Sequence, residues 1–107
     1  MAAPRSIAYH VVGDGWTAGQ PLLSYDRLAE LGRAPSWRWT DMTPECYPHG
    51  HLVCLFEDLE QARDFQRTYG GRIVEIDLWP EFRCVRNSEG YLAIPHQIAA
   101  EAIRLVD

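Results

Sequence analysis

The stretch that decides the fold is HLVCLFEDLEQARDFQRTYGGRIVEIDL, residues 51–78. Its first six residues form a short, mainly apolar run that predicts a strand. The acids Glu57 and Asp58 then mark the start of a helix, because leucine, alanine, phenylalanine and tyrosine recur behind them at helical spacing. The glycine pair at 70–71 ends that helix, and the last seven residues alternate as a strand with one exposed face. The stretch therefore predicts a strand, a helix and a second strand.

Two further elements precede this stretch. Residues 7–12 alternate in a way typical of a strand, which places His10 on a strand. Ser24 is suited to cap a short helix that carries Tyr25 and Leu28 at helical spacing and ends at Gly32. Between the two elements, a glycine-containing segment reads as a loop.

After residue 78 the sequence predicts two short strands and a third helix. The strands are expected at 82–85 and 91–94, separated by a turn. The helix is expected after Pro95, where Ile98, Ala102, Ile103 and Val106 form an apolar stripe. Consecutive strands joined by turns indicate an α+β fold with a mixed, mostly antiparallel sheet and three helices. With 107 residues, the chain (1–107) is expected to form a single domain.

Composition narrows the classes of function. The net charge is −5 and all ten basic residues are arginine, dispersed among fifteen acids, so binding to duplex nucleic acid is disfavoured. No run of eighteen apolar residues occurs, and we expect no membrane partner. Three cysteines are too few for a secreted disulfide framework, which favours a cytoplasmic location.

The segment 33–50 has no clear period and contains Trp37 and Trp39 among several prolines. Loops of this length in compact domains are uncommon unless they carry function, so it is a candidate surface for a protein partner. Two tryptophans that cover the edge of the core are an equally good interpretation.

Two chemical clusters compete for a catalytic or metal-binding role. Cys46, His49, His51 and Cys54 combine the ligand types that zinc prefers, but their spacing is not a recurrent zinc pattern. A strand would also send His51 and Cys54 to opposite faces, so the sequence predicts no metal site. Cys54 with His10 or His51 could form a nucleophile and base, although a buried thiol is the favoured interpretation.

A third constellation resembles a known family. Tyr9-His10 on the first strand and the short helix that ends in glycine resemble the opening of ADP-ribosyltransferase domains of the His-Tyr-Glu class. Residues 52–62, a strand that leads into a helix, are similar to their second element. Residues 89–95, with Glu89 and Tyr91 entering the last strands, are similar to their third. The resemblance implies that the sheet is split in two.

The resemblance also implies roles for particular residues. In the family, the histidine orients a ribose of NAD and the glutamate stabilises the cationic transition state, which assigns these catalytic roles to His10 and Glu89. The position of the family's tyrosine falls near Cys54, with Phe56 as the nearby aromatic residue. Cys54, Phe56 and Tyr91 would then bind the cofactor together with His10.

The sequence thus leads to two main hypotheses, with a small zinc-binding protein, testable by metal analysis of the purified chain, as a third class. By resemblance, the chain is an NAD-dependent ADP-ribosyltransferase-like protein that binds NAD or a related nucleotide and transfers ADP-ribose to a macromolecular acceptor. The alternative is a non-catalytic α+β binding module that holds a protein partner through the 33–50 loop.

Overall fold

The computed structural model describes residues 6–13, 16–32, 53–86 and 92–106, and its strands form two antiparallel sheets. One sheet has the strand order β1-β3-β6 and the other has the order β2-β5-β4. In chain order the elements are β1 (Ile7–Val12), α1 (Tyr25–Glu30), β2 (Val53–Leu55), α3 (Leu59–Tyr69), β3 (Arg72–Asp77), β4 (Val85–Arg86), β5 (Leu92–Ile94) and β6 (Ile103–Leu105), with a 3₁₀ turn at Ala100–Ala102. The predicted α+β class is confirmed. The sheet was expected to be mixed and mostly antiparallel, and every strand pairing among the described residues is antiparallel.

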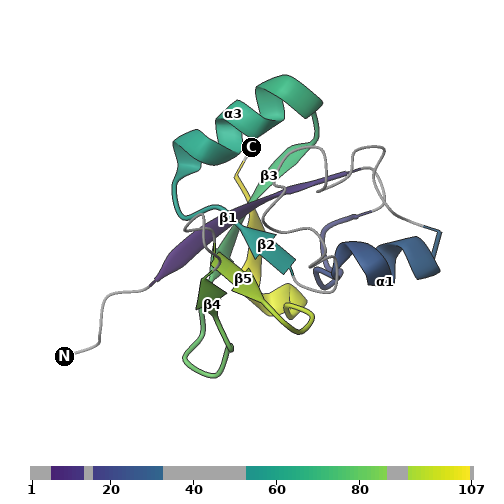
Figure 1. The fold of residues 1–107 in the computed structure, drawn as a ribbon, viewed down its shortest axis with the longest axis vertical. Coiled ribbons are helices and arrows are strands. Elements are labelled where there is room, and N and C mark those ends of the chain that lie inside the picture. The colour runs from purple at the N-terminus through teal and green to yellow at the C-terminus, as the bar shows by residue number, and fades with distance from the viewer. Residues whose placement is uncertain (1–5, 14–15, 33–52, 87–91, 107) are drawn as a thin grey trace.

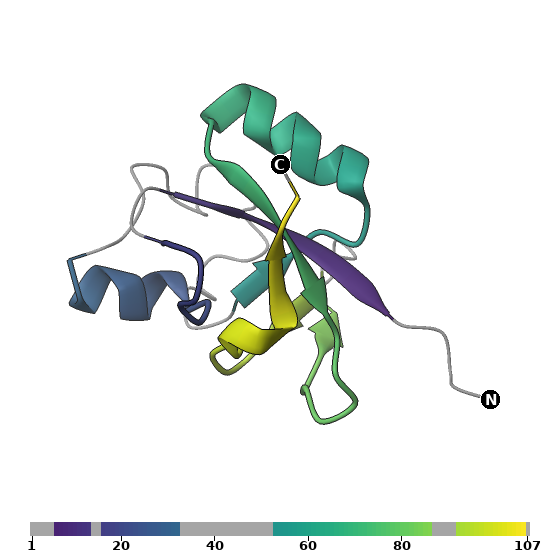
Figure 2. The same cartoon turned by 180° about the vertical axis from the view of Figure 1, so that it is seen from behind.

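Helix α3 begins and ends where local sequence dictates. The Asp58 side chain accepts a hydrogen bond from the Glu60 N–H at 3.1 Å and so caps the first turn. At the other end Gly70 has φ 82 and ψ −164, a combination that is essentially restricted to glycine. The helix packs Ala62 and Phe65 against β1 and β3, while its outer face is charged. Figures 1 and 2 show α3 on one side of β1 and α1 on the other.

Helix α1 also follows the prediction. The Ser24 hydroxyl accepts a hydrogen bond from the Arg27 N–H at 3.2 Å, which makes Ser24 the N-cap. Gly32, with φ 68, follows the last turn.

The two sheets meet at β1. Its long antiparallel ladder with β3 pairs Ile7 with Asp77 at one end and Val12 with Arg72 at the other. Toward the second sheet, by contrast, β1 makes one isolated bridge, in which Tyr9 and Phe56 exchange backbone hydrogen bonds of 2.7 and 2.8 Å.

Two groups of buried side chains fill the interior. The larger contains Ala8, Val12, Trp16, Leu22, Val53, Leu55, Val74, Ile76, Leu92, Ile94, Ile98 and Ala102. The smaller lies under α3 and contains Val11, Phe56, Ala62, Phe65 and Ile73. Because successive strand residues point to opposite faces, Ala8, His10 and Val12 face the larger group, and Val11 faces the smaller one.

The predicted third helix is wrong, and two α-helices are present among the described residues. Ile98 instead forms an antiparallel bridge with Leu22, and residues 103–105 form β6, which pairs with β3. The exposed edge of β3 supplies backbone hydrogen bonds to this segment, and Arg104 adds an ion pair with Asp77 at 3.1 Å. Since Ile98 and Ala102 would be buried in either conformation, their helical spacing did not distinguish between them.

The strand expected at 82–85 begins later than predicted. Phe82 lies in a turn, where its N–H donates to the Trp79 carbonyl oxygen at 3.0 Å, and β4 starts at Val85. The strand expected at 91–94 is present as β5 from Leu92 onward. Neither described helix is long and apolar enough to cross a membrane.

Candidate functional site

The candidate site is built around His10, the buried polar residue in the middle of β1. Its side chain is 9% exposed, and its Nδ1 atom lies 2.8 Å from the carbonyl oxygen of Cys54 on β2. Since a carbonyl oxygen only accepts, Nδ1 is the nitrogen that donates. The imidazole therefore joins the two sheets through a hydrogen bond between residues that are 44 positions apart.

The position of this bond explains how the sheets separate. Tyr9 and Phe56 exchange two backbone hydrogen bonds, so in an antiparallel ladder the next such pair would be Val11 and Cys54. The bridge at Tyr9 is isolated, and the Cys54 carbonyl oxygen accepts a hydrogen bond from the His10 ring. The split between the sheets thus opens next to His10.

Burial sets the charge state of the ring. Desolvation lowers the pKa of His10 to about 4, and the hydrogen bond to Cys54 opposes this effect only in part. The ring is therefore neutral at physiological pH. With the proton on Nδ1, Nε2 carries the lone pair and acts as a hydrogen-bond acceptor.

The structure brings His10 and Cys54 together through a hydrogen bond from the His10 ring to the backbone carbonyl oxygen of Cys54. The Cys54 side chain is 3% exposed, so it is suited neither to a solvent-facing nucleophile nor to contact with a large ligand. Phe56 forms the same bridge, but the residue is 4% exposed and its ring packs on Phe65 at a centroid distance of 5.6 Å. The Phe56 ring therefore faces the core under α3, on the side away from His10.

The other predicted site residues lie outside the described residues. These are Glu89 and Tyr91, the loop 33–50, and the potential zinc ligands Cys46, His49 and His51. Among the residues that are described, no group of three His, Cys, Asp or Glu side chains could hold a metal ion.

A concave region lies at the start of β1, away from His10. It is a cavity of about 520 Å³ lined by residues of several segments, among them Ile7, Glu57, Trp79, Cys84 and Leu92. Partial desolvation raises the pKa of the thiol of Cys84, an exposed residue, which keeps the thiol protonated at neutral pH and makes it a poor nucleophile. The cavity does not include His10, and its residues carry no part of the chemistry considered for the site.

Sequence reasoning missed one residue near His10. Arg72 starts β3 directly opposite Val12, and its side chain contacts Trp16 in the loop behind β1. Nothing in the spacing of the sequence signals this arrangement, because it depends on the register between β1 and β3.

Comparisons of this chain with protein-family models, with curated proteins and with solved structures found no match. The functional assignment therefore depends on the geometry around His10.

Proposed function

We propose that this protein binds NAD or a related nucleotide beside His10 and transfers ADP-ribose from NAD to a macromolecular acceptor. In this reaction the bond between the nicotinamide nitrogen and the ribose C1′ carbon breaks, and nicotinamide departs. A nucleophilic atom of the acceptor forms the new bond to C1′ and loses its proton. The positive charge that develops on the ribose requires a nearby carboxylate, for which Glu89 is the candidate.

The observation that carries the proposal is a neutral histidine held at the junction of two antiparallel sheets. Its Nδ1 atom is committed to the Cys54 carbonyl at 2.8 Å, which fixes both the tautomer and the orientation of the ring. Nε2 in that tautomer accepts hydrogen bonds, and a ribose hydroxyl is a suitable donor. A ring oriented in advance places the sugar at a fixed angle for departure of nicotinamide.

The sheet arrangement adds support. The division into β1-β3-β6 and β2-β5-β4 agrees with the split sheet expected for an ADP-ribosyltransferase-like fold. Strand β5, which follows Glu89 and Tyr91 in the chain, pairs with β2 through Cys54 and Ala93. The elements that carry the proposed residues are thus β1, β2 and the segment that leads into β5. In keeping with this intracellular substrate, we propose a cytoplasmic location.

One observation favours the alternative of a non-catalytic binding module. The Phe56 ring, which by resemblance would bind the cofactor, is packed against Phe65 in the core. Stacking on nicotinamide would then fall to Tyr91 or to another aromatic residue. A protein that kept the fold without a complete catalytic set would use the 33–50 loop to hold a protein partner.

Binding of NAD to wild type and to His10→Asn separates the ligand role of His10 from its structural role. The asparagine amide nitrogen occupies the place of Nδ1 and can still donate to the Cys54 carbonyl, but the variant has no counterpart of Nε2. We expect ligand-observed NMR to detect NAD binding to wild type and a loss of about tenfold or more in affinity for His10→Asn. The control is His96→Asn, since His96 is a partly buried histidine outside the site.

Catalysis is tested by chromatography of released nicotinamide, with Glu89→Gln as the variant. Nicotinamide release that disappears in Glu89→Gln while NAD still binds supports cleavage of the nicotinamide–ribose bond at this site. If millimolar NAD does not bind to wild type, or binds equally to His10→Asn, the nucleotide proposal is wrong and the binding-module alternative takes its place.

A further inference from the structure

The cavity at the start of β1 lies where the chain of β2 turns away from β1. Tyr9 exchanges backbone hydrogen bonds with Phe56, and in a continued antiparallel ladder Ile7 would do the same with Asp58. The bridge is isolated, however, and Asp58 caps α3 through its side chain. Ile7 therefore lines the cavity of about 520 Å³. Cavities of about 300–1,000 Å³ are the usual size for small-molecule sites.

One part of the cavity lining is apolar. Besides Ile7 it includes Leu78, Trp79 and Leu92. Leu92 belongs to the larger core, and Leu78 and Trp79 pack against that core as partly buried side chains. The cavity is thus an extension of the larger core to the surface, and its walls are suited to the apolar part of a ligand.

The indole of Trp79 is held in place by neighbouring aromatic rings. Its centroid lies 5.3 Å from that of Phe82, and the Phe82 ring in turn lies 5.5 Å from the His96 ring. The Phe82 N–H also donates to the Trp79 carbonyl oxygen at 3.0 Å. An indole with a defined position is the aromatic group that attracts a cation most strongly.

The polar part of the lining favours a positive ligand. It consists of Ser6, Glu57 and Cys84, so Glu57 supplies the only carboxylate among the described lining residues. None of these lining residues has a basic side chain. A carboxylate and an indole that line the same cavity, without a basic group beside them, match an ammonium group.

We infer that this cavity binds an organic cation with an apolar body, of the class of the primary arylalkylamines. The ammonium group donates charge-assisted hydrogen bonds to Glu57, and the apolar body lies against Trp79 and Leu92. This site does not include His10, and its ligand is not a nucleotide. The inference therefore goes beyond the proposed function and does not depend on it.

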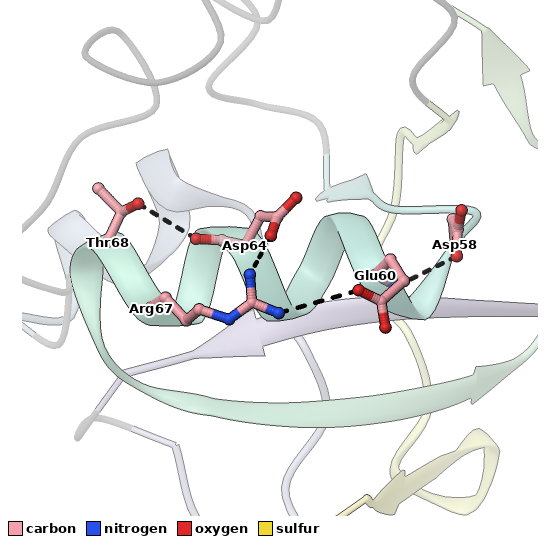
Figure 3. A network of polar contacts seen from close by, with 5 residues as sticks. All are labelled: Asp58, Glu60, Asp64, Arg67 and Thr68. Carbon is pink, nitrogen blue, oxygen red and sulfur yellow. Dashed lines mark hydrogen bonds and ion pairs between the residues drawn. The ribbon is translucent and has the colours of Figure 1, made fainter.

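The test compares probes that share a shape and differ in charge. These are phenethylamine, which is a cation, phenethyl alcohol, which is neutral, and phenylacetate, which is an anion. Calorimetric titration gives their affinities for wild type, Glu57→Gln and Trp79→Leu, and circular dichroism shows whether each variant folds. Glu60→Gln is the matched control, because it removes another exposed carboxylate from the start of α3, where Glu60 contacts Arg67 (Figure 3).

Cys84 provides a second readout that reports on the cavity itself. Its thiol is free and exposed, and the residue lines the cavity. The rate at which iodoacetamide alkylates Cys84, followed by mass spectrometry of the peptide that contains it, therefore shows whether a probe occupies this place.

We expect phenethylamine to bind wild type and to slow the alkylation of Cys84, and the other two probes to bind at least about tenfold more weakly. Glu57→Gln should lose about tenfold or more in affinity for phenethylamine, to the level of phenethyl alcohol. Trp79→Leu should lose about threefold or more, because the cation–π attraction is gone. Glu60→Gln should match wild type.

Three results would overturn the inference. They are equal affinity of wild type for the three probes, binding of phenethylamine without protection of Cys84, and no binding of phenethylamine at millimolar concentration. A folded Glu57→Gln that binds phenethylamine as wild type does would overturn it as well. The comparison of probes on wild type needs no variant, so it decides the matter even if a variant fails to fold.

Discussion

The Nδ1 atom of His10 lies 2.8 Å from the carbonyl oxygen of Cys54, so a side chain of β1 holds the backbone of β2 beside the place where the two sheets part. His10 is 9% exposed, and a polar ring is costly to bury unless it is hydrogen-bonded. The bond to Cys54 stabilises this arrangement and selects the neutral tautomer. Both effects can be measured through the dependence of stability on pH.

Lowering the pH should destabilise the protein through protonation of His10. An unfolded histidine titrates at 6.5, whereas folding lowers the pKa of His10 to about 4, so the unfolded chain binds more protons between these values. The stabilisation is therefore fully present above the unfolded pKa and is lost as the pH falls through this window. The full loss amounts to roughly 3 kcal/mol. Urea unfolding at about pH 7 and about pH 4 should show that His10→Asn, which cannot titrate, loses less stability than wild type by about this amount. Parallel losses in the two proteins would mean that His10 is not buried as described.

The second prediction concerns the start of α3. Asp58→Ala removes the acceptor for the Glu60 N–H and should lower the free energy of unfolding by about 1 kcal/mol. Asp64→Ala is the matched control, because it removes a carboxylate from the exposed middle of the same helix, where it contacts Arg67 (Figure 3). An exposed ion pair of this kind contributes less than about 0.5 kcal/mol. Urea denaturation followed by circular dichroism compares the two, and a larger cost for Asp64→Ala would contradict the assignment of the cap.

The third prediction concerns the segment that the sequence suggested to be a helix. Ile98 is 0% exposed and its backbone exchanges hydrogen bonds of 2.9 Å with Leu22. Ile98→Ala should therefore destabilise the protein by about 2 to 5 kcal/mol, since it leaves a cavity in the larger core. Leu105 on β6 is 38% exposed, and Leu105→Ala should cost about 1 kcal/mol or less. Thermal or urea unfolding measures the loss of stability in each variant, and equal losses would show that this segment packs differently.

Much of the fold could be predicted from the sequence, because the interactions that set these elements act between residues close in the chain. The start and end of α3 and of α1 were predicted because Asp58, Ser24 and Gly70 act on backbone groups within a few residues. The strands at 7–12 and 72–78 were found from their alternation. The last helix was predicted wrongly, because the spacing of Ile98 and Ala102 fits two conformations and the free edge of β3 favoured a strand.

The candidate site could be predicted from the sequence only in part. The sequence singled out His10 and Cys54 as candidates, but it did not reveal that the backbone carbonyl oxygen of Cys54 accepts a hydrogen bond from the His10 ring. It assigned Phe56 to a cofactor, whereas the ring packs on Phe65. Arg72 was overlooked, because its place beside His10 depends on strand register. The roles of Glu89 and Tyr91 stay predictions.

By itself, the sequence determined the elements whose signals act along the chain: an acid that caps a helix, a glycine that ends one, an alternation that makes a strand. These interactions span a few residues and need no partner from elsewhere. Only the tertiary structure decided which strands pair, where the sheet splits, and which side chains meet at the split. The contacts of His10 with Cys54 and of Arg72 with Trp16 join residues 44 and 56 positions apart. Pairings at that distance form only when the whole sheet assembles, since burial of the two cores selects one register among the many that local spacing allows.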